Sequence, residues 1–227
     1  MATEIRWLGH NAWAIMAGKH RLLLDPFLND NPLSPKKADQ VEADFILVSH
    51  GHGDHIGDTV EIAARTGATV IGIFEVCQWL SAHGVKNVHA MNLGGSYPFP
   101  FGRLTMTLAL HSSSMPDGSY AGNPCGFLLA REEGTVYFAC DTALFSDMKL
   151  IGAVGLDLAA VPIGDNYTMG PADALEAVRL LKPRRVVPIH NGTWPIIAQD
   201  ADRWARQVLE ETGVEALVLQ PGGMIVL

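Results

Sequence analysis

Ser49-His50-Gly51-His52-Gly53-Asp54-His55-Ile56-Gly57 is the most informative stretch of the chain, and it directly follows the apolar run Phe45-Ile46-Leu47-Val48. An apolar run that ends in a Gly-rich, His-rich segment predicts a buried strand followed by a loop. This loop carries four side chains of the kinds that bind metals. Because glycine tolerates many backbone conformations, Gly51 and Gly53 are expected to let these side chains converge. The stretch therefore predicts a metal-binding loop at the end of a strand.

The ligand types indicate a divalent transition metal. Neutral imidazoles and a carboxylate suit zinc or a similar ion, and a catalytic site leaves one coordination position for water. Asp54 and His55 are adjacent, so we expect them to point away from the pair formed by His50 and His52. That geometry suggests two ions instead of one. The alternative is a polar loop whose histidines face solvent, and the density of ligand types after one apolar run argues against it.

The motif His50-Gly51-His52-Gly53-Asp54-His55 resembles the signature of the metallo-β-lactamase superfamily. The segments Trp7–His10, Leu24–Phe27 and Pro162–Pro171 resemble the uncharacterised metal-dependent hydrolase branch of that superfamily, which is related to the ascorbate-phosphate lactonases and the N-acyl-phosphatidylethanolamine phospholipase D enzymes. The similarity spans nearly the whole chain. It implies one α/β domain over residues 1–227, a four-layer αββα sandwich of two mixed sheets with helices on the outer faces.

The resemblance also implies a complete set of metal ligands. The implied ligands of one ion are His50, His52 and His111. Those of the other ion are Asp54, His55 and His190, and Asp141 bridges the two.

Three residues are implied at the reacting centre by the same resemblance, namely Asp54, His10 and Asp165. His10 and Asp165 are expected beside the metal cleft, where each contacts substrate or supports a ligand; a structural role is the alternative for His10. Asp25 is expected beneath the metal loop. A buried carboxylate in that place would hold the N–H of a ligand histidine and fix its tautomer.

This ligand set predicts a metal-dependent hydrolase. Two divalent ions, Zn²⁺ or alternatively Mn²⁺ or Fe²⁺, would hold a bridging hydroxide as the nucleophile, because metal binding lowers the pKa of water to roughly 7. Two such ions, two aspartates and one hydroxide leave about one positive charge in the cleft. A small anionic ester, phosphodiester or lactone is therefore the expected substrate. The alternatives are an iron-dependent oxidoreductase on the same fold and a non-catalytic metal-binding protein, both disfavoured by the intact ligand set.

The hydrophobic pattern predicts the order of the elements. Three short strands open the chain, strand and helix then alternate as in layered α/β proteins, and an antiparallel section follows. A helix opens at Pro171, and a second helix spans Asp200–Glu211. Beyond the second helix, Leu217–Leu219 and Ile225–Leu227 are expected to complete the sheet.

Composition restricts the partners and the compartment. The chain has 227 residues, 48% of them hydrophobic, and a formal net charge of −8, which argues against general binding to nucleic acid or anionic membranes. Three cysteines make a disulfide framework unexpected and favour a reducing compartment. Neither a secretion signal nor a membrane-spanning run is visible. We therefore expect a cytoplasmic enzyme with a small-molecule substrate, and a homo-oligomer is compatible with the sequence.

Overall fold

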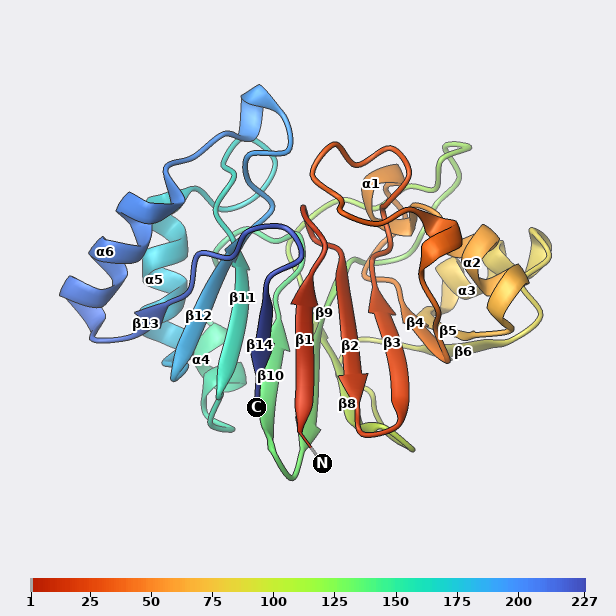
Figure 1. The fold of residues 1–227 in the computed structure, drawn as a ribbon, viewed down its shortest axis with the longest axis horizontal. Helices are drawn as coiled ribbons and strands as arrows, with labels where there is room; N and C mark the ends of the chain where they lie inside the picture. The colour runs from red at the N-terminus through yellow and green to blue at the C-terminus, as the bar shows by residue number, and fades with distance from the viewer. Residues whose placement is uncertain (1) are drawn as a thin grey trace.

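The computed structural model describes residues 2–227 as two mixed β-sheets that face each other (Figure 1). The first sheet contains, in spatial order, β14 (Met224–Val226), β1 (Thr3–Trp7), β2 (Trp13–Ala17), β3 (His20–Leu24), β4 (Phe45–Leu47), β5 (Thr69–Ile73) and β6 (Val88–Met91). The second contains β13 (Glu215–Ala216), β12 (Arg185–Ile189), β11 (Leu158–Pro162), β10 (Gly134–Phe138), β9 (Cys125–Arg131), β8 (Gly102–Leu108) and β7 (Ser96–Phe99).

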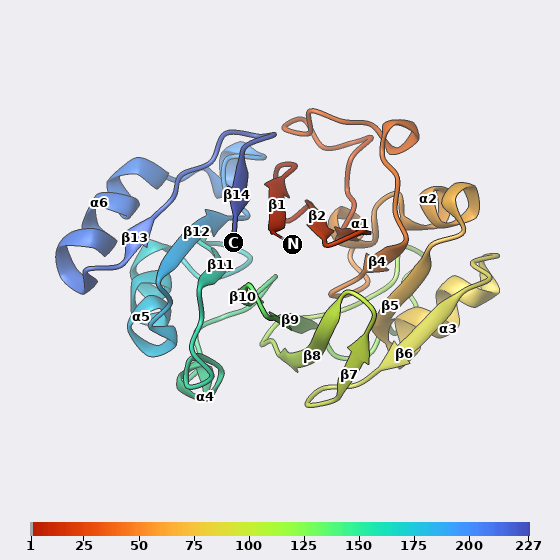
Figure 2. The same cartoon turned by 60° about the horizontal axis from the view of Figure 1, so that its bottom comes forward.

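Helices cover the outer sides of both sheets (Figure 2). The first sheet carries α2 (Thr59–Thr66) and α3 (Phe74–Ala82), and the second carries α4 (Met148–Gly152), α5 (Pro171–Leu181) and α6 (Ala201–Thr212). The one-turn helix α1 (Gly53–Ile56) and the short 3₁₀ helices η1 (Ala38–Gln40) and η2 (Pro195–Ile197) lie in connections. This arrangement confirms the predicted αββα sandwich. Within residues 2–227, every helix is too short or too polar to span a membrane.

The two sheets share one pairing pattern, which supports a chain made of two similar halves. In the first sheet β1, β2 and β3 form an antiparallel meander, and β4, β5 and β6 then continue in parallel. In the second sheet β7 to β10 are antiparallel, and β11, β12 and β13 follow in parallel. The last strand, β14, returns to the first sheet and pairs with β1 through Ile5 and Ile225. The two termini are therefore tied together.

The main core fills the space between the sheets. Strand β1 alternates buried and exposed residues, as expected of a strand with one face on a core. Trp13 of β2 is fully buried, and its ring centroid lies 5.6 Å from that of Phe138 of β10, across the gap between the sheets. A second cluster, which includes Trp204 and Val178, packs α5 and α6 against the outer side of the second sheet.

The predicted strand at Leu217–Leu219 is wrong. Strand β13 ends at Ala216, and the N–H of Leu217 donates a last hydrogen bond to the carbonyl of Val186 before the chain turns away. Leu217 and Leu219 are apolar because they pack against the main core, not because they pair in the sheet. The edge strand β7 was not predicted, and it contains Pro98, a residue that is tolerated in a sheet mainly at its edges.

The expected role of Gly51 and Gly53 is also wrong. Neither residue has the positive φ that would require glycine, and Gly53 is simply the first residue of α1. Gly51 is required for space, because a Cβ there would lie 2.5 Å from Cβ of Ala121 and 2.7 Å from Sδ of Met115. The positive φ falls at Gly57, which ends α1 beside the backbone of Phe27.

Trp13→Ala should test the contact between the sheets. Removing this buried indole leaves a cavity between the sheets and should lower the free energy of unfolding by about 3–5 kcal/mol. Met16→Ala is the matched control, since Met16 lies on the same strand but is 38% exposed. The control should cost less than about 1 kcal/mol. Urea unfolding followed by circular dichroism measures both, and equal losses would contradict this description of the core.

Candidate metal centre

The candidate ligands all follow the carboxyl-terminal ends of strands, at the upper edge of the sheets in Figure 1. The loop after β4 carries four of them, and one each follows β8, β10 and β12. Strands β1 and β3 end at the same edge and lead to His10 and Asp25. Because both sheets present these ends together, residues that lie far apart in the sequence meet between the sheets.

Backbone strain is concentrated at this edge. Among the described residues, the non-glycine positions with positive φ are His10, Asp25, Cys140, Asp165, Asn166, His190 and Lys182. Only Lys182, which caps α5, lies elsewhere. A left-handed conformation costs roughly 1–2 kcal/mol for most residues. Such clusters persist where function requires an abrupt turn.

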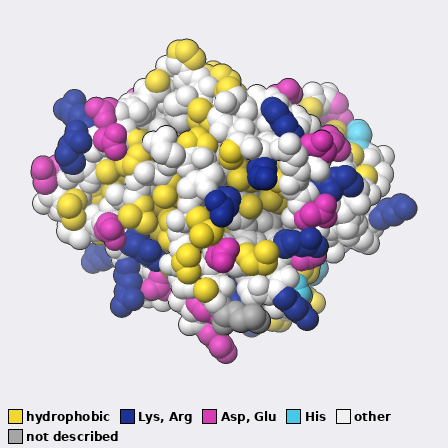
Figure 3. Space-filling view, in the orientation of Figure 1, with side chains coloured by type: hydrophobic (Ala, Val, Ile, Leu, Met, Phe, Trp, Pro, Cys, Tyr) yellow, Lys and Arg dark blue, Asp and Glu magenta, His cyan; other side chains and the backbone are white. Residues whose placement is uncertain are grey.

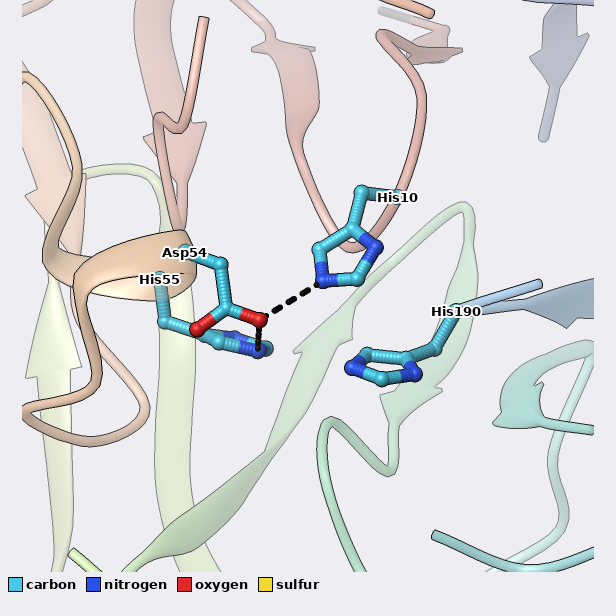
Figure 4. A group of neighbouring side chains, drawn as sticks. All are labelled: His10, Asp54, His55 and His190. Carbon is cyan, nitrogen blue, oxygen red and sulfur yellow. Dashed lines mark hydrogen bonds and ion pairs between the residues drawn. The ribbon is translucent and has the colours of Figure 1, made fainter. Parts of the chain in front are cut away.

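The side chains form groups whose ligand atoms all lie within 4.8 Å of one another. One group is His50, His52 and His111. The second is His10, Asp54, His55 and His190, so it contains His10 in addition to the three expected residues (Figure 4). A third group joins the first two and consists of His50, His55 and Asp141.

Asp141 lies where both groups meet. Its Oδ2 is 3.5 Å from Nε2 of His111 in the first group. The same oxygen is 3.4 Å from Nε2 of His55 and 3.1 Å from Nε2 of His190 in the second. One carboxylate thus contacts histidines of both groups.

Asp25 organises the loop from below, as predicted. Its Oδ1 accepts a hydrogen bond from the Ser49 N–H at 2.7 Å. Its Oδ2 accepts from Asn11 Nδ2 at 2.7 Å, from Ser49 Oγ at 2.5 Å and from His55 Nδ1 at 2.8 Å. The carboxylate is fully buried, so these donors replace the water that it would otherwise bind.

These contacts assign the tautomers of two histidines. A carboxylate only accepts, so His55 Nδ1 carries a proton and, in the neutral ring, Nε2 is a free lone pair. Ser49 Oγ gives its single proton to Asp25, and it therefore accepts a hydrogen bond from His50 Nδ1 at 3.0 Å. His50 Nε2 is left unprotonated in turn. One buried carboxylate thus leaves an unprotonated ring nitrogen in each of the two groups.

His10 is buried behind Asp54 and does not line the cavity. Its Nε2 is 3.1 Å from Oδ2 of Asp54, and its Nδ1 is 2.8 Å from Oγ1 of Thr193. The carboxylate accepts from Nε2–H, so Nδ1 accepts from the Thr193 hydroxyl. Burial, together with the nearby His190, lowers the pKa of His10 to about 4. A neutral His10 holds Asp54 in place, in contrast to the substrate contact that was one of the two expectations.

Burial keeps the first group neutral. It lowers the pKa of His50, His52 and His111, so each imidazole retains a lone pair at neutral pH. Neutral imidazole is the form that binds metals. These side chains are ready to bind a cation without first losing a proton.

Asp141 and its neighbour His55 favour their charged forms. Burial disfavours charge on His55, but Asp141 and Asp25 outweigh burial and raise the pKa of His55 well above its usual value. Burial also opposes the charge of Asp141, yet His190 and His55 hold the pKa of Asp141 well below its usual range. A bound cation would take the place of the His55 proton, since ligand histidines must be neutral.

The donor set fits divalent transition ions. Among residues 2–227, two buried polar atoms at this site have no hydrogen-bond partner, namely His190 Nδ1 and Asp141 Oδ1, and Nε2 of His55 and of His190 approach only carboxylates, without hydrogen-bond geometry. Unpaired buried polar atoms are costly and need an explanation. Imidazole nitrogens and carboxylate oxygens that converge here are the donors that zinc and similar ions prefer.

A cavity of about 720 Å³ opens onto the centre. Its inner wall includes His52, Asp54, His111, Asp141 and His190. Asp165 is not part of the wall. It is exposed, its Oδ1 accepts a hydrogen bond from its neighbour Asn166, and its carboxylate lies against Gly170.

The outer wall is formed by Tyr167, Trp194 and Ile196, with Ser112 beside them. The three large side chains of this wall were not predicted. Tyr167 comes from the loop that also carries Asp165, and Trp194 and Ile196 follow His190 closely. An apolar Trp-Pro-Ile-Ile run directly after a candidate ligand was the signal in the sequence that could have identified this wall.

Known proteins are similar to this chain in sequence and in fold. Residues 20–191 match the model of the Beta-lactamase superfamily domain. A UPF0173 metal-dependent hydrolase of Thermus thermophilus is 49% identical over 222 residues, with 98% of each chain covered. One of Symbiobacterium thermophilum is 50% identical over 223 residues, with 96% of this chain and 97% of the relative covered.

Among solved structures, Igni18, a novel metallo hydrolase from the hyperthermophilic archaeon Ignicoccus hospitalis, has a TM-score of 0.91 and 32% identity. The match covers 100% of this chain and 99% of Igni18. The fold, the candidate ligands at the sheet edge and the sequence similarity all indicate the same family. The chain belongs to the UPF0173 metal-dependent hydrolases of the β-lactamase superfamily.

Proposed function

We propose that the chain binds two divalent ions, most simply Zn²⁺ with Mn²⁺ or Fe²⁺ as alternatives, and hydrolyses a small ester, phosphodiester or lactone that carries negative charge. The observation that carries the proposal is the position of Asp141, whose Oδ2 contacts His111 of one group and His55 and His190 of the other. A carboxylate in this position is suited to bridge the two proposed ions.

The ligands of the proposed ions follow from the groups of side chains. His50, His52 and His111 would hold one ion, and Asp54, His55 and His190 the other. When bound, the ions supply a nucleophilic hydroxide at neutral pH and polarise the scissile group.

The remaining residues position this centre. His10 accepts a hydrogen bond from Thr193 and donates one to Oδ2 of Asp54. The other oxygen of Asp54, Oδ1, remains available to a metal ion. Asp25 directs the ligand nitrogens of His50 and His55 toward the cleft. Asp165 remains a proposed site residue through an indirect role. Its carboxylate accepts a hydrogen bond within the loop that also places Tyr167 at the cavity.

The two alternatives are less well supported. An iron-dependent oxidoreductase would share the fold, but the close relatives bear the name of metal-dependent hydrolases. A protein that only stores or senses metal would not need an open cavity of about 720 Å³ beside the ligands.

Asp141→Ala should reduce the content of both ions, because only a bridging ligand touches both. Elemental analysis after equilibration at a low, buffered concentration of free Zn²⁺ should show less than one ion per chain, against two for the unaltered protein. Asp147→Ala is the control, since Asp147 is an exposed carboxylate nearby in sequence. Two ions bound at unaltered affinity in Asp141→Ala would exclude the bridging role.

Asp25→Asn should weaken binding at both ion sites although Asp25 touches neither. The amide cannot accept from all four donors, so the tautomers of His50 and His55 are no longer fixed. Loss of such support typically costs 10–100-fold in metal affinity. Competition with a chromophoric chelator measures the affinities, and Asp30→Asn, an exposed change in the next loop, is the control. An effect confined to one ion would show that Asp25 supports only one group.

Hydrolysis itself should depend on the ions. The metal-loaded chain should hydrolyse at least one class in a panel of p-nitrophenyl esters, phosphodiesters and lactones, and a chelator should reduce the rate to background. In single turnover in ¹⁸O water, the label should enter the product and not a side chain. Full activity after chelation, or label found first in the protein, would overturn the proposal.

A further inference from the structure

The cavity wall has two chemically different parts. The inner part consists of candidate ligands, and the outer part is apolar and aromatic, formed by Tyr167, Trp194 and Ile196. A substrate whose scissile group reaches the ions must lay its remaining part against this outer wall. The outer wall therefore selects the substrate.

The outer wall combines a fixed ring with two exposed side chains. The ring of Trp194 lies 5.0 Å from that of His10 and 6.1 Å from that of Phe27, so packing holds it beside the second ligand group. Tyr167 is 55% exposed and Ile196 is 58% exposed. Figure 3 shows apolar side chains gathered at the top of the molecule, where Figure 1 places η2. Exposed apolar surface that adjoins a site is typical of ligand binding.

Positive charge is absent from this cavity. Within the described part of the chain, no Lys or Arg lines it, whereas Asp54 and Asp141 do. Two divalent ions, these two carboxylates and a hydroxide leave about one positive charge, and Asp25 below the loop reduces its effect. The centre can therefore balance one negative charge at the scissile group. A second anionic group would lie on an apolar wall without a partner, which is unfavourable.

We propose, on the basis of the function proposed above, that the substrate is an ester or phosphodiester with at most one negative charge, located at the scissile group, and with an apolar or aromatic arm. The arm packs on Tyr167, Trp194 and Ile196. In the hydrolysis, the water oxygen bonds to the carbonyl carbon or phosphorus, and the bond to the leaving oxygen breaks with its electron pair. One water proton goes to the leaving oxygen and the other to solvent.

Binding of non-hydrolysable phosphinates to the Zn²⁺-loaded chain tests the proposal without relying on turnover. Diphenylphosphinate and dimethylphosphinate carry the same single charge and differ only in their arms. Calorimetry should show diphenylphosphinate bound roughly tenfold or more tightly, as for an apolar group in a hydrophobic pocket. (2-Carboxyethyl)methylphosphinate, which adds a charge to one arm, should bind no more tightly than dimethylphosphinate. Equal affinity for the two uncharged-arm probes, or preference for the charged arm, would overturn the proposal.

Two variants locate the effect on the outer wall. Ile196→Lys should weaken diphenylphosphinate binding and strengthen binding of the carboxyethyl probe several-fold, because it places a cation where the arm lies. Val154→Lys makes the same change at an equally exposed residue outside the cavity and should alter neither affinity. If both variants behave alike, the outer wall does not contact the arm.

Turnover separates this inference from the proposed function. Bis(p-nitrophenyl) phosphate should be hydrolysed with a kcat/KM roughly tenfold above that of methyl p-nitrophenyl phosphate, which lacks one aromatic arm. Hydrolysis of both at the same efficiency would refute the inference and leave the hydrolase intact. Tight, arm-dependent phosphinate binding without hydrolysis of any substrate would support the inference and remove the proposed function.

Discussion

The buried carboxylate of Asp25 is the contact on which the candidate metal centre depends. Burying an isolated carboxylate costs several kcal/mol or more, and Asp25 persists because four donors surround it. Two of these donors belong to Ser49, whose hydroxyl in turn accepts a hydrogen bond from Nδ1 of His50 and so fixes that ring. A third donor is Nδ1 of His55. The two ligand groups therefore share one support and cannot be oriented independently.

This support works only because the strand ends meet. Strands β1 and β3 of one sheet and β10 and β12 of the other all end at one edge, and the residues that follow turn abruptly into left-handed conformations. The N–H of His190 donates to the carbonyl of His10, which joins the two sheets across the cleft. The free energy stored in these turns is offset by the two cores below, which hold the strands in register.

Much of the architecture could be predicted from the sequence. The apolar run before His50 and the alternation of strands and helices are local patterns, and local patterns survive in a single sequence. Four of the candidate ligands could be named because they lie within six residues, whereas His111, Asp141 and His190 were named from the resemblance to the metallo-β-lactamase superfamily. The errors arose where a local pattern has two explanations. Leu217–Leu219 is apolar because it packs on the core, and Gly51 is small because Ala121 approaches it closely.

By itself, the sequence indicated the αββα layering and the candidate metal ligands, because the order of its elements is a local pattern and its short motifs resemble those of a known superfamily. Only the tertiary structure decided how those residues are used. It placed His10 behind Asp54 through a contact with Thr193, 183 positions away, and it brought Tyr167 and Trp194 to one wall while leaving Asp165 outside. Such contacts depend on how the two sheets face each other, and that packing arises from the whole core instead of from any one segment.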